Sequence, residues 1–129
     1  MLNTVAWFHA LLGDYEEARA CCQQSLALIA TLGGCEFEDA VWDTLGYIEL
    51  HLGNFAQAAE HCEFALGLCR DHGDRIAEAE ILTHLGDARH AAGDLPRARQ
   101  AWQQALVIYD EIYHPDAGKV REKLASAAD

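Results

Sequence analysis

Apolar residues recur along the chain at spacings of one, three and four, which places them on one face of a helix. The clearest stripe runs from Val41 through Leu45 and Ile48 to Leu52. Gly53 follows, and glycine ends helices well because it reaches the left-handed conformation without a Cβ penalty. Stripes of this kind fill the chain and leave no room for a sheet. The helices are expected at about residues 1–12, 14–31, 37–52, 54–71, 75–92, 94–113 and 115–127.

The pattern repeats with a period of 40 residues. A step of glycine, then Asp or Asn, then an aromatic residue or Leu starts at Gly13, Gly53 and Gly93. The positions that keep this register are Ala18, Ala58 and Ala98; Leu26, Leu66 and Leu106; Leu28, Leu68 and Ile108; and Cys22, Cys62 and Trp102. Each unit therefore predicts two helices joined by a tight turn. One such hairpin cannot bury both of its apolar faces, so we expect neighbouring hairpins to stack into a solenoid.

Residues that can cap helices follow two of these glycines. Asp14 with Glu17, and Asn54 with Gln57, have the spacing of a capping box, in which side chains satisfy the free N–H groups at a helix start. We therefore predict side-chain caps at Asp14 and Asn54. Pro96 is expected in the first turn of its helix, where a missing N–H costs nothing.

The last helix is expected to begin with Pro115 at or near its first position. Val120 and Leu124 alternate there with charged residues. A terminal helix with a polar outer face shields the end of a stacked array, so this segment is predicted to be a capping helix.

The repeated residues resemble the tetratricopeptide repeat (TPR) motif: a large residue, Leu-Gly, Gly-x-aromatic, Ala, a large residue and Ala-Leu. The matches in the second unit are Trp42, Leu45, Gly46, Gly53, Phe55, Ala58, Cys62, Ala65 and Leu66, and those in the third are Leu82, Leu85, Gly86, Gly93, Leu95, Ala98, Trp102, Ala105 and Leu106. The first unit matches less well, with Val5 and Ala6 in place of Leu-Gly and Ser25 in place of the late alanine.

This resemblance implies a fold and a domain organisation. The fold is an all-α, TPR-like α-solenoid of three helical hairpins with a 40-residue period and a C-terminal capping helix. Its repeats span about 1–34, 37–73 and 75–113, its cap spans 115–127, and residues 1–129 form a single domain. Because the usual TPR period is 34, each unit is expected to carry longer helices or a longer connection.

The third unit adds a narrower resemblance. It is similar to the C-terminal TPR region of SARP-type and related NTPase-linked bacterial transcriptional regulators over the residues LGDARHAAGDLPRARQAWQQALVIYDEIYHPDAGKVREKL. In that family, DNA binding and nucleotide hydrolysis belong to upstream domains, and the TPR array receives a signal or a partner. The first motif position falls before Met1, so we expect the chain to be a piece of a longer regulator.

The charge balance argues against several kinds of partner. The chain has 9 Lys and Arg residues against 21 Asp and Glu residues, a formal net charge of −12. Such a surface repels phosphate backbones and anionic headgroups, so direct binding of nucleic acid or of a membrane is not expected. No apolar run reaches the roughly 20 residues of a membrane span. The cysteines form no C-x-x-C pair, which favours reduced thiols in a cytoplasmic protein.

The resemblance also implies a binding surface, because the first helices of TPR hairpins line a concave groove. The motif positions that usually face a ligand are occupied here by Asn3, Trp7, Asp43, Tyr47, His51, Glu80, Thr83, Asp87 and His90. None is Lys or Arg, so the cationic clamp with which some TPR domains hold a C-terminal carboxylate is not expected. We expect a basic or amphipathic protein or peptide segment, anchored on Trp7 and Tyr47 and oriented by Asp43 and Asp87. Alternatively, the aromatic residues pack between hairpins and the acids form a solvated face.

Catalytic and metal chemistry find little support in the sequence. His61, Cys62 and Cys69 lie on one predicted helix, but the two cysteines are about 10.5 Å apart along its axis, too far to share one ion. No glycine-rich phosphate loop is present. We therefore expect no metal, no cofactor and no enzymatic activity. Trp42 and Trp102 occupy packing positions of the motif and are expected in the core.

These observations predict a protein-interaction scaffold that serves as the sensor region of a bacterial transcriptional regulator. Its partner is expected to be another protein or upstream domains of the same polypeptide. Two alternatives are a free-standing cytoplasmic adaptor and an array that binds a small molecule or a short signalling peptide. Binding on the convex face also stays open.

Overall fold

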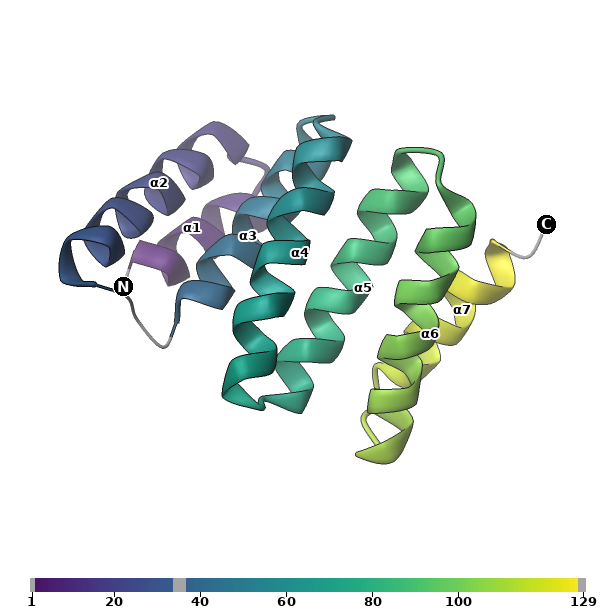
Figure 1. The fold of residues 1–129 in the computed structure, drawn as a ribbon. Helices are drawn as coiled ribbons and strands as arrows, with labels where there is room; N and C mark the ends of the chain where they lie inside the picture. The colour runs from purple at the N-terminus through teal and green to yellow at the C-terminus, as the bar shows by residue number, and fades with distance from the viewer. Residues whose placement is uncertain (1, 34–36, 128–129) are drawn as a thin grey trace.

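The structure, a computed structural model, describes residues 2–33 and 37–127, without the side chains of residues 2–5 and 8. All regular structure in that part of the chain is helical (Figure 1). The helices are α1 (Leu2–Leu11), α2 (Tyr15–Leu32), α3 (Glu38–His51), α4 (Phe55–His72), α5 (Arg75–Ala91), α6 (Leu95–Glu111) and α7 (Ala117–Ser126). The predicted all-α architecture is confirmed, and the predicted helix ends differ from the observed ones by a few residues at most.

The helices form three hairpins, α1–α2, α3–α4 and α5–α6, which stack side by side, and α7 packs on α6 at the end of the array (Figure 1). Helices α1, α3 and α5 contact one another in order. Each second helix contacts the first helix of the next hairpin, α2 with α3 and α4 with α5. This is the predicted α-solenoid, in which every hairpin buries its second apolar face against its neighbour.

Two clusters of buried side chains form the core, and they meet at Trp42. One cluster joins α1, α2 and α3, and the other joins helices α4 to α7. Trp42 is partly buried and packs against both, with its ring centroid 5.2 Å from that of His61 and 4.9 Å from that of Phe64. Trp102 is only 3% exposed. Both tryptophans therefore contribute to packing, as predicted.

A glycine lets the two helices of each later hairpin approach closely. Gly46 faces Cys62, and Gly86 faces Trp102 at the equivalent position. A Cβ atom on Gly86 would lie 2.3 Å from Nε1 of Trp102, far inside van der Waals contact. The same nitrogen donates a hydrogen bond to the carbonyl of Thr83 at 3.3 Å. Gly86 is therefore required for the indole to reach its hydrogen-bond acceptor.

The turn inside each hairpin contains a glycine in the left-handed conformation, as predicted. The φ angle is 85° at Gly13, 88° at Gly53 and 89° at Gly93. Pro96 lies in the first turn of α6, also as predicted. The 40-residue period of the sequence therefore corresponds to the spacing of the three hairpin turns.

The predicted side-chain caps at Asp14 and Asn54 are wrong. Both side chains turn toward the residue five positions earlier. Asp14 lies 3.7 Å from Nδ1 of His9, and the amide of Asn54 donates to the Glu49 carboxylate at 3.2 Å. These partners compete with the backbone N–H groups of the following helix. The equivalent Asp94 does cap its helix, by accepting a hydrogen bond from a backbone N–H of the first turn.

The last helix begins two residues later than predicted. Helix α6 ends at Glu111, and the chain then turns through Tyr113, whose φ is 54°. The N-cap of α7 is Asp116, so Pro115 precedes the helix instead of occupying its first position. The imidazole of His114 stabilises this longer turn, because its Nδ1 accepts a hydrogen bond from the backbone N–H of Asp116 at 3.1 Å.

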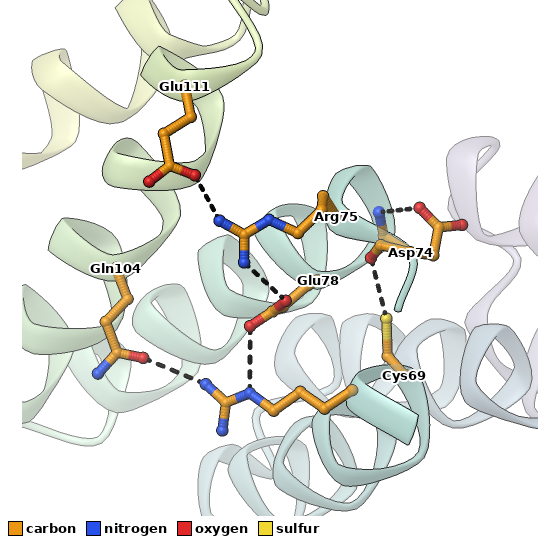
Figure 2. Close-up of polar contacts among 8 residues, drawn as sticks. Cys69, Asp74, Arg75, Glu78, Gln104 and Glu111 are labelled. Atoms are coloured by element: carbon orange, nitrogen blue, oxygen red, sulfur yellow. Dashed lines mark hydrogen bonds and ion pairs between the residues drawn. The ribbon is translucent and has the colours of Figure 1, made fainter. Parts of the chain in front are cut away.

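Charged side chains connect the last two hairpins at the edge where α4 ends and α5 begins (Figure 2). The guanidinium of Arg70 lies 3.1 Å from one carboxylate oxygen of Glu78, and that of Arg75 lies 3.5 Å from the other. Arg75 also reaches Glu111 on α6 at 2.5 Å, and Arg70 donates to Gln104 on α6 at 3.4 Å. The network joins α4, α5 and α6, so it helps to hold the second and third hairpins in register.

Replacing Gly86 by Ala is expected to destabilise the chain, because the new methyl group would clash with Trp102. We expect the free energy of unfolding, measured by urea denaturation, to fall by about 2 kcal/mol. Gly67 in α4 provides the matched control, since a Cβ there meets no atom within 4 Å. Gly67→Ala should instead gain about 0.5–1 kcal/mol from helix propensity. Equal stability of the two variants would contradict the close packing of α5 on α6.

Candidate binding groove

The first helices of the hairpins and α7 enclose a groove of about 660 Å³. Its lining includes Trp7 from α1, Asp43 from α3, Glu80 and His84 from α5, and Lys119 from α7. This volume lies within the range of about 300–1,000 Å³ that is typical of ligand sites. Because each helix adds one layer to the solenoid, successive helices bring polar side chains distant in sequence onto one surface.

The structure places the nine predicted contact residues in different surroundings. Four line the groove, namely Trp7, Asp43, Glu80 and Thr83. Four others lie on α3 and α5 outside the lining, namely Tyr47, His51, Asp87 and His90. His51 and His90 are exposed near the ends of these helices. Asn3 lies on α1, and its side chain is outside the described residues.

Asp43 forms an ion pair with His84, a groove residue that sequence reasoning missed. Nδ1 of His84 lies 2.8 and 3.0 Å from the two carboxylate oxygens of Asp43, so the pair links α3 to α5. Burial alone would lower the pKa of His84, but the charge and hydrogen bond of Asp43, with Asp87 and Glu80 adding to the effect, raise it to about 9. The imidazole is therefore protonated at neutral pH. Its position four residues after Glu80, on the same helix face, was the available signal.

Trp7 and Tyr47 pack around this imidazolium. The ring centroids of Trp7 and Tyr47 are 5.0 Å apart, and those of His84 lie 6.5 Å from Trp7 and 5.9 Å from Tyr47. The Tyr47 ring lies within the roughly 6 Å at which an aromatic ring can stabilise a cation, whereas the Trp7 ring lies beyond it. The two aromatic residues thus join α1, α3 and α5, and Trp7 also presents part of its ring to the groove.

Asp87 is also held by partners within the chain. One of its carboxylate oxygens lies 3.0 Å from Nζ of Lys123 and accepts a hydrogen bond from Nε1 of Trp102 at 3.2 Å. Asp43 and Asp87 are therefore both neutralised by neighbouring cations. Charge reversal at either position would disturb the packing of α5 against α3 or α7 as well as any binding.

Glu80 differs from these two acids. Its side chain is exposed at the groove, and no hydrogen bond or ion pair joins its carboxylate to another of the residues described. Partial burial raises the pKa of Glu80; the charge of Asp43 adds to the shift, and the charge of His84 partly offsets it. Since the net pKa is raised, a cation placed beside this carboxylate would stabilise its charged form.

Helix α7 contributes two lysines to the groove, although its charged residues were expected only to form a polar outer face. Lys119 and Lys123 are four residues apart and line the groove together with Val120. The Lys119 side chain is 76% exposed, and its ammonium lies 3.5 Å from Asp116. The groove therefore has an acidic side from α3 and α5 and a basic side from α7.

The described residues contain no group of three His, Cys, Asp or Glu side chains arranged to hold a metal ion. Burial is the main cause that raises the pKa of the Cys22 and Cys69 thiols to about 12. These thiols are thus protonated at neutral pH and are poor nucleophiles. Within the same part of the chain, no helix is long and apolar enough to cross a membrane.

The raised pKa of His84 makes stability dependent on pH. Since the pKa is about 9 in the folded state and about 6.5 in the unfolded state, the stabilisation is complete below pH 6.5 and is lost as pH rises toward 9. We expect the free energy of unfolding to fall by about 2 kcal/mol between pH 6.5 and 8.5, as measured by urea denaturation. His84→Gln should abolish this dependence, whereas His72→Gln, at an exposed position on α4, should retain it. The same slope in all three proteins would contradict the pairing.

Comparison with known proteins agrees with this architecture. Family models described as tetratricopeptide repeat match residues 1–34 and 37–126. The N-terminal domain of stress-induced protein-1 (STI-1) from C. elegans has a similar structure, with a TM-score of 0.73 over 99% of this chain and 92% of that one. The sequence identity is 16%, so this likeness concerns the fold alone.

Two curated proteins are similar in sequence, and both are named regulatory protein AfsR. The one from Streptomyces griseus is 40% identical over 81 residues, which are 61% of this chain and 8% of that protein. The one from Streptomyces coelicolor is 41% identical over 68 residues, 53% of this chain and 7% of that protein. The predicted resemblance to bacterial regulators is confirmed, over less than a tenth of each relative's length. TPR arrays are non-enzymatic scaffolds for protein–protein interaction, and this chain belongs to the tetratricopeptide repeat family.

Proposed function

We propose that this chain is the TPR regulatory region of a bacterial transcriptional regulator and binds a basic or amphipathic protein segment in its groove. The similarity to regulatory protein AfsR supports the regulatory role. The array acts in the cytoplasm, and the segment belongs either to another protein or to another part of the same polypeptide.

The observation that carries this proposal is the unpaired carboxylate of Glu80. Its pKa is raised by burial and by Asp43, so its charged form is less stable than in water. A Lys or Arg side chain of a partner would place a cation within ion-pair distance of Glu80 and form a charge-assisted hydrogen bond. No other described residue offers that counter-charge within ion-pair distance of Glu80.

The apolar part of the segment would lie on Trp7, Ala40 and Ala77, which line the groove and are partly exposed. An aromatic ring beside small aliphatic side chains gives contact area, while the charge sets the orientation. In this arrangement Asp43 and Asp87 stabilise the groove through His84 and Lys123, and Glu80 contacts the partner.

A peptide selection tests this function. A phage-displayed library of random peptides is selected against the purified chain, and the enriched peptides are synthesised with a fluorescent label. We expect enrichment of sequences that combine Lys or Arg with apolar residues. Glu80→Gln should weaken their affinity by about 3- to 10-fold in fluorescence anisotropy, and added salt should reduce the difference.

Glu17→Gln serves as the matched control, because Glu17 is an exposed glutamate on α2 outside the groove. It should leave the affinity unchanged. Enrichment of acidic peptides, or equal binding by the wild type and Glu80→Gln, would refute the proposed contact.

A further inference from the structure

The groove has two sides of opposite charge, and only a few of their charges are available to a ligand. On the α3 and α5 side, Asp43 is neutralised by His84 at 2.8 Å. Asp39 is buried, with only 8% of its surface exposed. Glu80 is therefore the available negative charge on this side.

On the α7 side, the two lysines also differ. Lys123 is 37% exposed and lies 3.0 Å from Asp87, which holds it against α5. Lys119 is 76% exposed, and its pair with Asp116 at 3.5 Å joins two solvent-accessible groups. Pairs of this kind contribute little and are easily exchanged for another partner. Lys119 is therefore the available positive charge on this side.

A segment with charges of one sign would not suit this surface. A uniformly basic segment that meets Glu80 would bring a second cation toward Lys119 and Lys123. A uniformly acidic segment that meets Lys119 would bring a carboxylate toward Glu80. Like charges placed together across an interface oppose binding, so both arrangements are disfavoured.

We propose that the groove selects a bipolar segment, in which a Lys or Arg side chain contacts Glu80 and an Asp or Glu side chain of the same segment contacts Lys119. The inference rests on the proposed function and adds the second charged contact of the same groove. It makes Lys119 a specificity-determining residue. It also gives the bound segment a direction, because the reversed orientation would place like charges together at both contacts.

The peptides selected above provide the probe. Wild-type selection is expected to enrich an Asp or Glu at a constant spacing from the basic residue. One such peptide is synthesised with this acid and with Gln in its place. The change to Gln should weaken binding to the wild type by about 3- to 10-fold. It should have no effect on binding to Lys119→Gln, because the contact is already absent there.

Two further variants complete the test. Arg97→Gln removes a cation that is 60% exposed on α6 outside the groove, and this variant should keep the full dependence on the peptide acid. Lys119→Arg should keep it as well, since the positive charge is retained. Circular dichroism confirms that each variant is folded.

The outcomes separate this inference from the proposed function. The bipolar segment is refuted if peptides bind through Glu80 but carry no acid. It is also refuted if replacing the peptide acid by Gln weakens binding to Lys119→Gln as much as binding to the wild type. In both cases the proposal of a basic segment stands. If no enriched peptide depends on Glu80, both proposals are refuted.

Discussion

The ion pair between Asp43 and His84 determines the character of the groove. It joins α3 to α5 at 2.8 Å, so it fixes the second hairpin to the third at the surface that a ligand would meet. It also removes one negative charge from that surface, because the imidazole is protonated when its pKa is about 9. Trp7 and Tyr47 lie beside the His84 ring and extend the connection to α1. Because Asp43 is neutralised in this way, Glu80 is the negative charge that this side of the groove offers to a ligand.

The fold could be predicted from the sequence because its determinants are local and repeated. A glycine with positive φ is needed at every hairpin turn, and a residue without a side chain is needed where Trp102 approaches α5. Both requirements appear in the sequence as glycines in a 40-residue register. The side-chain caps predicted at Asp14 and Asn54 are absent because these side chains have partners in the preceding helix. The last helix begins after Pro115, where the His114 imidazole accepts a hydrogen bond from the backbone N–H of Asp116.

The site was predictable only in part, because motif positions show which residues face the groove but not what those residues already contact. Asp43 and Asp87 were expected to orient a partner, yet each has a cationic neighbour from another helix. His84 and Lys123 are 41 and 36 residues away from them, so no spacing rule within one helix could reveal these pairs. Because the sequence does not show these pairs, it could not show that Glu80 is the acid that stays available to a partner.

Helix α7 shows how a helix outside the three hairpins contributes to the charge of the groove. Helix α7 packs on α6 as the first helix of a further hairpin would, so one of its faces continues the surface formed by α1, α3 and α5. Lys119 and Lys123 lie on this face, so the stacking of the helices directs both side chains into the groove. A helix outside the three hairpins therefore sets the sign of one side of the groove.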